Sequence, residues 1–123
     1  MKVVLNGVIF DIEGKPVIII RYIEGVKNEI PQKFCNIIYG KALQKYTSND
    51  ADTIKYYNIA EKMYENSRVD ECEIEITTDE FKTMNELLSR EKLIIKAKFL
   101  EMAQKLNPEL FDENSLLIEN EEA

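Results

Sequence analysis

The sequence predicts an α+β fold, in which a small antiparallel sheet, made of an N-terminal hairpin and one later strand, packs with about four helices. Two segments near the N-terminus, residues 2–11 and 17–23, are rich in the branched and aromatic residues that favour strands. Strict alternation of apolar and acidic residues over residues 71–76 indicates one further strand. The remaining segments repeat apolar residues at helical spacing, which completes the prediction.

The N-terminal hairpin is the first predicted element. Its strands, residues 2–11 and 17–23, are joined by a turn at residues 11–16, where Gly14 tolerates a positive φ. The second strand contains a continuous apolar run, so we expect it to be buried on both faces or to lie beneath a helix. Residues 24–31, which follow it, are expected to form a loop.

Four helices are predicted from apolar periodicity and from the signals at their ends. The first covers about residues 31–46, and the second covers about residues 50–66 after a cluster of capping residues. Thr77 and Glu80 match a capping box, which predicts that the third helix begins beside them. The last helix covers residues 93–106 and ends before an Asn-Pro pair.

The strand predicted between the second and third helices has two unlike faces. Alternation places Cys72, Ile74 and Ile76 on the face that we expect to be buried. The carboxylates of the other face would lie about 7 Å apart along the strand and could bind a cation or a basic partner. An ordinary solvated face with lysines opposite is the favoured interpretation. The acidic face consists of Glu71, Glu73 and Glu75.

The length and the charge distribution indicate one domain with an acidic extension. We divide the 123 residues into a single α+β domain at residues 1–106 and an acidic C-terminal tail at residues 107–123. The tail contains six of the 23 acidic residues and none of the 16 basic ones, so the domain keeps 17 acidic residues and a net charge of −1. A nearly neutral domain argues against general nucleic-acid binding, which depends on clustered Lys and Arg.

Catalytic and metal-binding groups are scarce. The chain contains no histidine, which removes the commonest general base, the commonest metal ligand and every Ser-His or Cys-His pair. Asp11 and Glu13 could bind a metal, but turn formation is favoured because no third ligand lies near them in sequence. Cys35 and Cys72 are expected to be reduced thiols. We therefore expect a protein that is not an enzyme and has no cofactor or metal.

The location of the protein follows from the absence of targeting signals. No apolar run approaches the length of a membrane span, and no signal peptide is recognisable, so we expect a cytoplasmic protein without a membrane partner. The free edge of a short sheet can pair with a second copy, which leaves a homo-oligomer open.

Five of the six tyrosines fall on the first two predicted helices. Tyrosine is enriched at protein interfaces, because its ring can be buried while its hydroxyl remains hydrogen-bonded. At helical spacing, packing in the core is the alternative, and it is favoured for the set as a whole. The candidate partner surface combines four tyrosines with the acidic strand face: Tyr39, Tyr46, Tyr57, Tyr64, Glu71, Glu73 and Glu75.

The order of motifs resembles that of a loose group of small proteins that are encoded by phages and prophages and have no assigned function. The shared motifs are a D-x-x-G-K-P turn at residues 11–16, the segment Y-Y-N-I-A-E-K-M-Y at residues 56–64, a strand leading into a capped helix at residues 74–81, and I-K-A-K at residues 95–98. The similarity in order covers most of residues 3–104. It implies a viral accessory or assembly role and carries over no functional residue.

The expected function is that of a small, non-enzymatic, phage-type accessory protein that binds another macromolecule in the cytoplasm of the host. The partner is expected to be a protein, either a host or defence factor or an assembly partner. One alternative is a protein that binds a small ligand or nucleotide in an aromatic-lined cleft between helices. Further alternatives are a virion or assembly structural protein and, least favoured, an enzyme that uses carboxylates alone.

Overall fold

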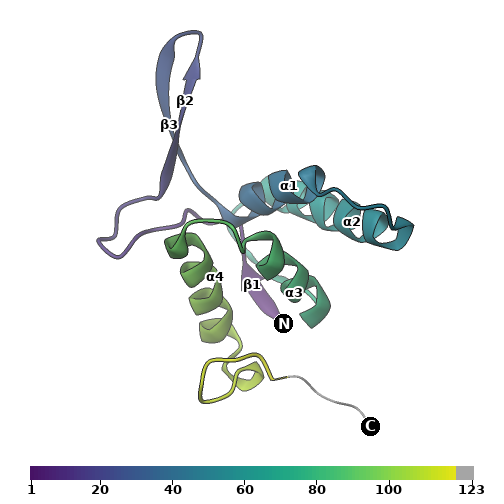
Figure 1. The fold of residues 1–123 in the computed structure, drawn as a ribbon. Helices are drawn as coiled ribbons and strands as arrows, with labels where there is room; N and C mark the ends of the chain where they lie inside the picture. The colour runs from purple at the N-terminus through teal and green to yellow at the C-terminus, as the bar shows by residue number, and fades with distance from the viewer. Residues whose placement is uncertain (119–123) are drawn as a thin grey trace.

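A computed structural model describes residues 1–118 and confirms the α+β class. Within these residues the chain forms four α-helices and two separate two-stranded antiparallel sheets (Figure 1). Three of the six acidic residues that the sequence assigns to the tail, Glu119, Glu121 and Glu122, lie outside the described residues.

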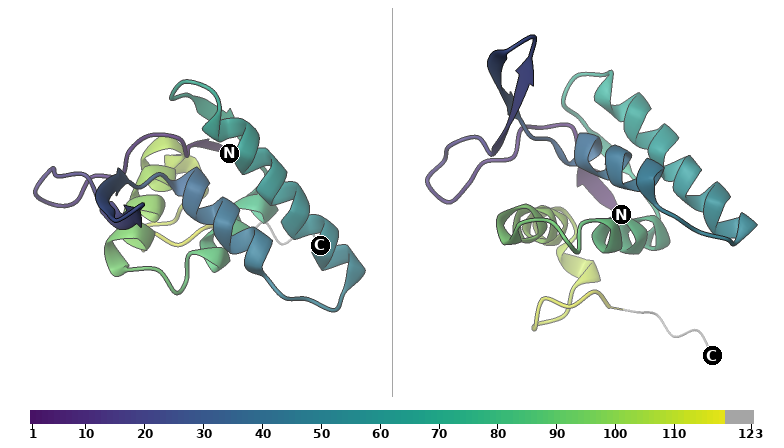
Figure 2. Two further views of the ribbon diagram at one scale, coloured as in Figure 1. Left: turned by 90° about the horizontal axis from the view of Figure 1, so that it is seen from above. Right: turned by 45° about the horizontal axis from the view of Figure 1, so that its top comes forward.

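The first sheet joins two segments that are distant in sequence. β1 (Lys2–Val4) pairs with β4 (Glu73–Glu75), so that Val3 lies opposite Ile74. The second sheet consists of the consecutive strands β2 (Ile18–Ile23) and β3 (Val26–Pro31). β1 lies among the helices, whereas β2 and β3 project away from them (Figures 1 and 2). We call β2, β3 and their turn the hairpin arm.

The helices form two layers around β1. The helices α1 (Phe34–Gln44) and α2 (Asp50–Ser67) lie side by side. The other layer contains α3 (Thr78–Leu87) and α4 (Leu93–Leu106), and the short 3₁₀ helix η1 (Pro108–Leu110) follows α4 (Figure 2). The predicted bounds of the last helix are confirmed, because an apolar stripe and an Asn-Pro stop mark it.

Local hydrogen bonds explain where the second and third helices begin. Asn49 Oδ1 accepts a hydrogen bond from the Asp52 N–H at 3.1 Å, as an N-cap does. Thr77 Oγ1 accepts from the Glu80 N–H at 3.0 Å, and Glu80 Oε1 accepts from the Thr77 N–H at 2.9 Å. The predicted capping box is therefore confirmed.

The hydrophobic core is centred on Phe99 of α4. Its ring stacks on Phe81 with centroids 5.1 Å apart, and it meets Phe34 edge-on at 5.4 Å. The core draws on β1, on the segment after it and on all four helices, and its other fully buried side chains include Val3, Leu5, Ile38, Met63, Met84 and Leu88.

Two buried amides tie the N-terminal segment to distant parts of the chain. The Asn6 amide donates to backbone carbonyls at the C-terminal end of α2, including that of Asn66 at 3.0 Å, and accepts from the Cys72 N–H at 3.0 Å. Asn107 accepts from the Lys2 N–H at 2.7 Å and donates to the Lys2 carbonyl at 2.6 Å. Asn107 thus satisfies backbone groups of β1 that no neighbouring strand pairs with, and Asn6 satisfies backbone groups of the segment after α2.

The hairpin arm contradicts two expectations. Residues 24–31 are not a loop, because Glu24 and Gly25 have φ values of 51° and 80°, the positive values of a type I′ turn that joins two strands. The predicted second strand is not buried on both faces either: Ile20 is 50% exposed and Tyr22 is 71% exposed. Within the apolar run at residues 17–20, Val17 packs against the core, whereas Ile19 and Ile20 are exposed.

The remaining corrections follow from these pairings. The predicted pairing of the strand at residues 2–11 with the strand at residues 17–23 is wrong, because β1 pairs with β4 and β2 pairs with β3 in a separate sheet. The first predicted strand is regular only over β1, and Phe10 forms an isolated bridge with Pro16. The first helix begins at Phe34 rather than near residue 31, because Pro31 belongs to β3. Cys72 is exposed, since β4 begins one residue after it.

Part of the C-terminal segment folds back on the body. Phe111 meets the ring of Phe81 edge-on, with centroids 6.2 Å apart. Asp112 Oδ1 accepts from the N–H groups of Asn114 and Leu116 in a tight turn, and Gln104 of α4 donates to the Ser115 carbonyl at 3.1 Å. Two apolar side chains of this segment, Phe111 and Leu117, thus pack against the core.

Candidate functional site: two exposed surfaces

Three of the four candidate tyrosines meet on one exposed surface. Tyr39 of α1 and Tyr64 of α2 have ring centroids 6.1 Å apart. A shallow groove of about 190 Å³ lies between the two helices. We call this the tyrosine surface, and its lining residues are Tyr39, Leu43, Tyr57, Ala60, Glu61 and Tyr64.

Helical geometry explains why these tyrosines are exposed although the helices are amphipathic. On α2, Tyr56 and Tyr57 are neighbours in sequence, but one residue turns the helix by about 100°. Tyr56 is buried, whereas Tyr57 and Tyr64, seven residues apart, share an exposed stripe. The candidate tyrosines of this surface are therefore not core residues, while Tyr56 is one.

The edge of the tyrosine surface carries a positive charge. The Tyr64 hydroxyl accepts a hydrogen bond from Arg68 Nη1 at 2.7 Å, and the guanidinium carbon lies 5.4 Å from the ring centroid. Glu61 provides one carboxylate in the groove. A flat aromatic patch with one cation and one anion beside it is typical of protein-binding surfaces.

The other candidate residues lie elsewhere. Tyr46 is 90% exposed and follows α1, where it lines a different groove. Glu73 lies 3.8 Å from the Lys2 ammonium, and Glu75 lies 3.2 Å from the Met1 nitrogen. Glu71 lines a third groove with residues of α4. The predicted combination of tyrosines and acidic strand residues is thus spread over several elements.

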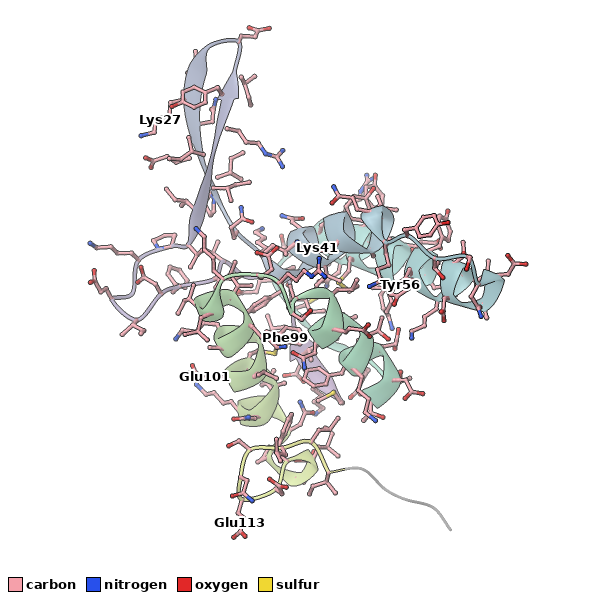
Figure 3. All side chains as sticks on the ribbon, in the orientation of Figure 1. Lys27, Lys41, Tyr56, Phe99, Glu101 and Glu113 are labelled. Atoms are coloured by element: carbon pink, nitrogen blue, oxygen red, sulfur yellow. The ribbon has the colours of Figure 1, made fainter. Side chains whose placement is uncertain are left out.

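The hairpin arm is the second surface, and its exposure was not expected from the sequence. Its side chains project on both faces of the ribbon, and Lys27 marks its outer part, far from Phe99 in the core (Figure 3). The signal that could have identified it is the dipeptide Glu24-Gly25, which directly follows the branched segment 18–23 and can form a two-residue turn. Its large apolar side chains that are exposed are Ile19, Ile20, Tyr22, Ile23 and Val26.

Two larger grooves border α1. One, of about 400 Å³, separates the base of the hairpin arm from α1. The other, of about 570 Å³, lies between the end of α1 and the end of α3 and contains Lys41, Lys45 and Arg90 beside Tyr46. Lys41 is paired with Glu91 at 3.2 Å, so part of the positive charge of this groove is neutralised.

Groups for catalysis or metal binding do not gather in the described part of the chain. Within residues 1–118, no three His, Cys, Asp or Glu side chains are placed to hold a metal ion. The Asp11 carboxylate accepts from the N–H groups of Glu13 and Lys15, both at 2.9 Å, so it stabilises its own turn. Burial raises the pKa of the Cys35 thiol, more than Lys33 nearby lowers it.

No helix among residues 1–118 combines the length and the apolar character that crossing a membrane requires.

Comparison with known proteins adds no assignment to these surfaces: no protein-family model, no curated protein and no solved structure matches the chain.

Proposed function

We propose that this chain acts by binding another protein, as an accessory factor and not as an enzyme. The observation that carries the proposal is the tyrosine surface, where Tyr39, Tyr57 and Tyr64 are exposed side by side over two packed helices. Aromatic side chains presented by rigid helices can bury a large area at a small entropic cost. These three tyrosines do not belong to the hydrophobic core cluster, so their rings are available for contact with a partner.

The class of partner follows from the resemblance to small phage-encoded proteins. That resemblance favours a host or defence factor, or an assembly component, in the cytoplasm of an infected cell. Arg68 and Glu61 at the tyrosine surface favour a partner whose own interface carries both charges.

The proposal is tested by capture from a bacterial lysate with the purified full chain as bait. The triple variant Tyr39→Ser, Tyr57→Ser, Tyr64→Ser removes the aromatic surface, and we expect it to recover at least about tenfold less of the captured protein. The matched control is Tyr46→Ser, which removes an exposed tyrosine outside this surface and should leave capture unchanged. Circular dichroism checks that both variants are folded.

Two results would contradict the proposal. One is a wild-type chain that captures no protein more strongly than the triple variant does. The other is an equal loss in the triple variant and in Tyr46→Ser, which would mean that capture reports general stickiness of exposed tyrosine.

A second candidate function is the binding of an anionic small molecule such as a nucleotide. It rests on the groove that Lys41, Lys45, Arg90 and Tyr46 line together with one carboxylate, Glu86. A thermal-shift series with nucleotides tests it, because a ligand at 100 times its dissociation constant adds about 2.7 kcal/mol to the stability. Loss of the shift in Lys45→Ala and Arg90→Ala would support this site, and no shift with any nucleotide would exclude this function.

A further inference from the structure

The two outer edges of the hairpin arm are open but unlike. In the described part of the chain, no strand pairs with the outer side of β2 or of β3. An open strand edge presents unpaired N–H and C=O groups and is a template for pairing with another strand. Natural proteins protect such edges with charged residues and proline.

The pairing of the arm shows which backbone groups face outward. The Gln32 N–H donates to the Val17 carbonyl at 2.8 Å, and the turn between Ile23 and Val26 has two residues. In an antiparallel ladder, alternate pairs exchange hydrogen bonds, so the pairs that include residues 19, 21 and 23 point inward. The Val17 N–H donates to the Ile9 carbonyl at 2.8 Å, below the regular ladder. The outward groups of β2 therefore belong to Ile18, Ile20 and Tyr22.

The residues at the outward positions of the two strands are of different kinds. Those of β3 are of the kinds that protect a strand edge from pairing, and those of β2 are not. On β3, the outward positions are Lys27, Glu29 and Pro31, and the two charged side chains lie 3.8 Å apart. On β2, the outward positions are all apolar. β3 thus carries the features that prevent edge pairing, and β2 carries none at these positions.

We propose that two copies of this chain form a two-fold dimer by antiparallel pairing of β2 with β2. The register is centred on Ile20, which faces Ile20 of the second copy, while Ile18 faces Tyr22 of the second copy on each side. The three facing pairs exchange two hydrogen bonds each, about six in all. One face of the new sheet then carries a continuous apolar stripe of Ile18, Ile20 and Tyr22 from both copies.

Charge selects this register. Centred on Ile20, the pairing places Arg21 opposite Ile19 of the second copy, so no like charges face each other. If the two-fold axis lay at Arg21 instead of Ile20, Arg21 of one copy would lie directly opposite Arg21 of the other. Like charges in facing positions are destabilising. If the axis lay at Ile19, fewer pairs of outward-facing residues could exchange hydrogen bonds than in the register centred on Ile20.

The arm itself favours a second copy as its occupant. A two-stranded hairpin is marginally stable alone, and three or more strands are needed for independent stability. Pairing two arms makes a sheet with the order β3, β2, β2, β3, in which both remaining edges carry Lys27 and Glu29. The assembly is therefore closed, and it stops at two copies. The tyrosine surface lies on other elements, so this dimer is independent of the proposed function.

Native mass over a concentration series tests the dimer. By light scattering from about 1 µM to about 500 µM, we expect the wild-type mass to rise from one copy to two and no further. Ile20→Lys places two lysines face to face at the two-fold axis and should leave one copy at every concentration. Lys27→Glu alters only the β3 edge and should behave as the wild type does. A wild type that stays single, or dimerisation lost in Lys27→Glu and kept in Ile20→Lys, would overturn the proposal.

A crosslink tests the register without relying on disruption. Facing residues of a hydrogen-bonded pair have Cα atoms about 5.5 Å apart, within the range that a disulfide spans. In a Cys72→Ser background, Ile20→Cys should form a covalent dimer under mild oxidation. The matched control Ile23→Cys places an equally accessible thiol on the same strand, opposite residue 17 of the second copy, and should crosslink at least about tenfold more slowly. Equal crosslinking of the two variants would contradict the Ile20-centred register.

Discussion

The two sheets of this molecule are both two-stranded and antiparallel, but they differ in length and in what surrounds them. β1 and β4 have three residues each, and β2 and β3 have six. The outer N–H groups of β1 are bound, that of Lys2 by Asn107 and that of Val4 by the Met102 sulfur at 3.4 Å. The longer sheet has open edges within residues 1–118.

The difference shows that strand length and apolar content do not decide which sheet belongs to the core. The short sheet is placed there because α4 packs against β1 and side chains satisfy its free backbone groups. The long one is stabilised by its turn and by its own ladder. We call the four helices with β1 and β4 the body. A variant in the body should therefore change the free energy of unfolding, and a variant in the hairpin arm should change the association of two copies.

The largest expected effect is on the core beside the short sheet. Phe99→Ala removes a fully buried ring that contacts Phe34 and Phe81, and should lower the free energy of unfolding by about 3–5 kcal/mol. Tyr22→Ala removes an exposed ring from the arm and should change it by less than about 0.5 kcal/mol. Urea denaturation of dilute protein measures both, and similar losses would mean that the arm is part of the cooperative unit.

The next largest difference is expected between two asparagines, Asn6, which follows β1, and Asn28, which lies in β3. Asn6→Ala leaves three carbonyls and one N–H of the segment 66–72 without this partner, and should cost about 2 kcal/mol. Asn28→Ala removes a single exposed hydrogen bond to the Val26 carbonyl and should cost less than about 0.5 kcal/mol. Thermal and urea denaturation compare them, and a cost for Asn28→Ala equal to that of Asn6→Ala would contradict the distinction.

Two glycine substitutions distinguish the stability of the hairpin arm from the stability of the rest of the domain. Gly25 has a φ of 80°, so Gly25→Ala should destabilise the arm by about 1 kcal/mol. Hydrogen exchange should then accelerate in β2 and β3 and stay unchanged in β1. Gly40→Ala, in α1 and with nothing within 4 Å of an added Cβ, should instead stabilise the body by about 0.5–1 kcal/mol. Faster exchange in β1 of Gly25→Ala would show that the arm supports the body.

The smallest expected effect is a loss of stability at low pH. Burial alone would raise the pKa of Glu80, but hydrogen bonds from Thr77 and Lys62 outweigh it and hold that pKa below its ordinary value. A carboxyl group with a lowered folded pKa stabilises the fold above its unfolded pKa, and this contribution is lost as the pH falls through the folded pKa.

The wild type should therefore lose part of its free energy of unfolding below about pH 4.5. The loss in Glu80→Gln should be smaller than the loss in the wild type, by under about 1 kcal/mol. Glu29→Gln is the control on the arm, where the ion pair with Lys27 is exposed on both sides. Denaturation at pH 3 and pH 7 measures the difference. A larger acid response in the Glu80→Gln chain than in the wild type would contradict the sign.

Local signals made much of the fold predictable. The capping box of Thr77 and Glu80 and the stripe of the last helix depend only on neighbours in sequence, so they could be read directly. The arm could not, because an apolar run normally indicates burial and nothing in residues 17–23 shows that no helix covers them. Glu24 adds to this difficulty, since a positive φ is uncommon for a glutamate.

The tyrosine surface was predictable only in part. Spacing placed Tyr56 on the apolar line of the second helix and Tyr57 and Tyr64 beside it, and the structure confirms that Tyr56 is buried and the other two are exposed. Spacing could not show that Tyr39 would meet Tyr64, because that depends on how α1 and α2 pack. Tyr46 and the carboxylates of β4 could not be placed relative to the other tyrosines, since no local rule links an exposed segment to a distant strand.

The bond between Lys2 and Asn107 also constrains the order of events during synthesis. It spans 105 positions, so the first strand cannot reach its final partners until nearly the whole chain has left the ribosome. The hairpin arm closes through a two-residue turn, and a hairpin forms within microseconds once its residues are available. The arm can therefore form before the body folds, although a two-stranded hairpin is only marginally stable by itself. The proposed pairing through β2 would stabilise the arms of neighbouring nascent chains on one messenger while their cores are still unfinished.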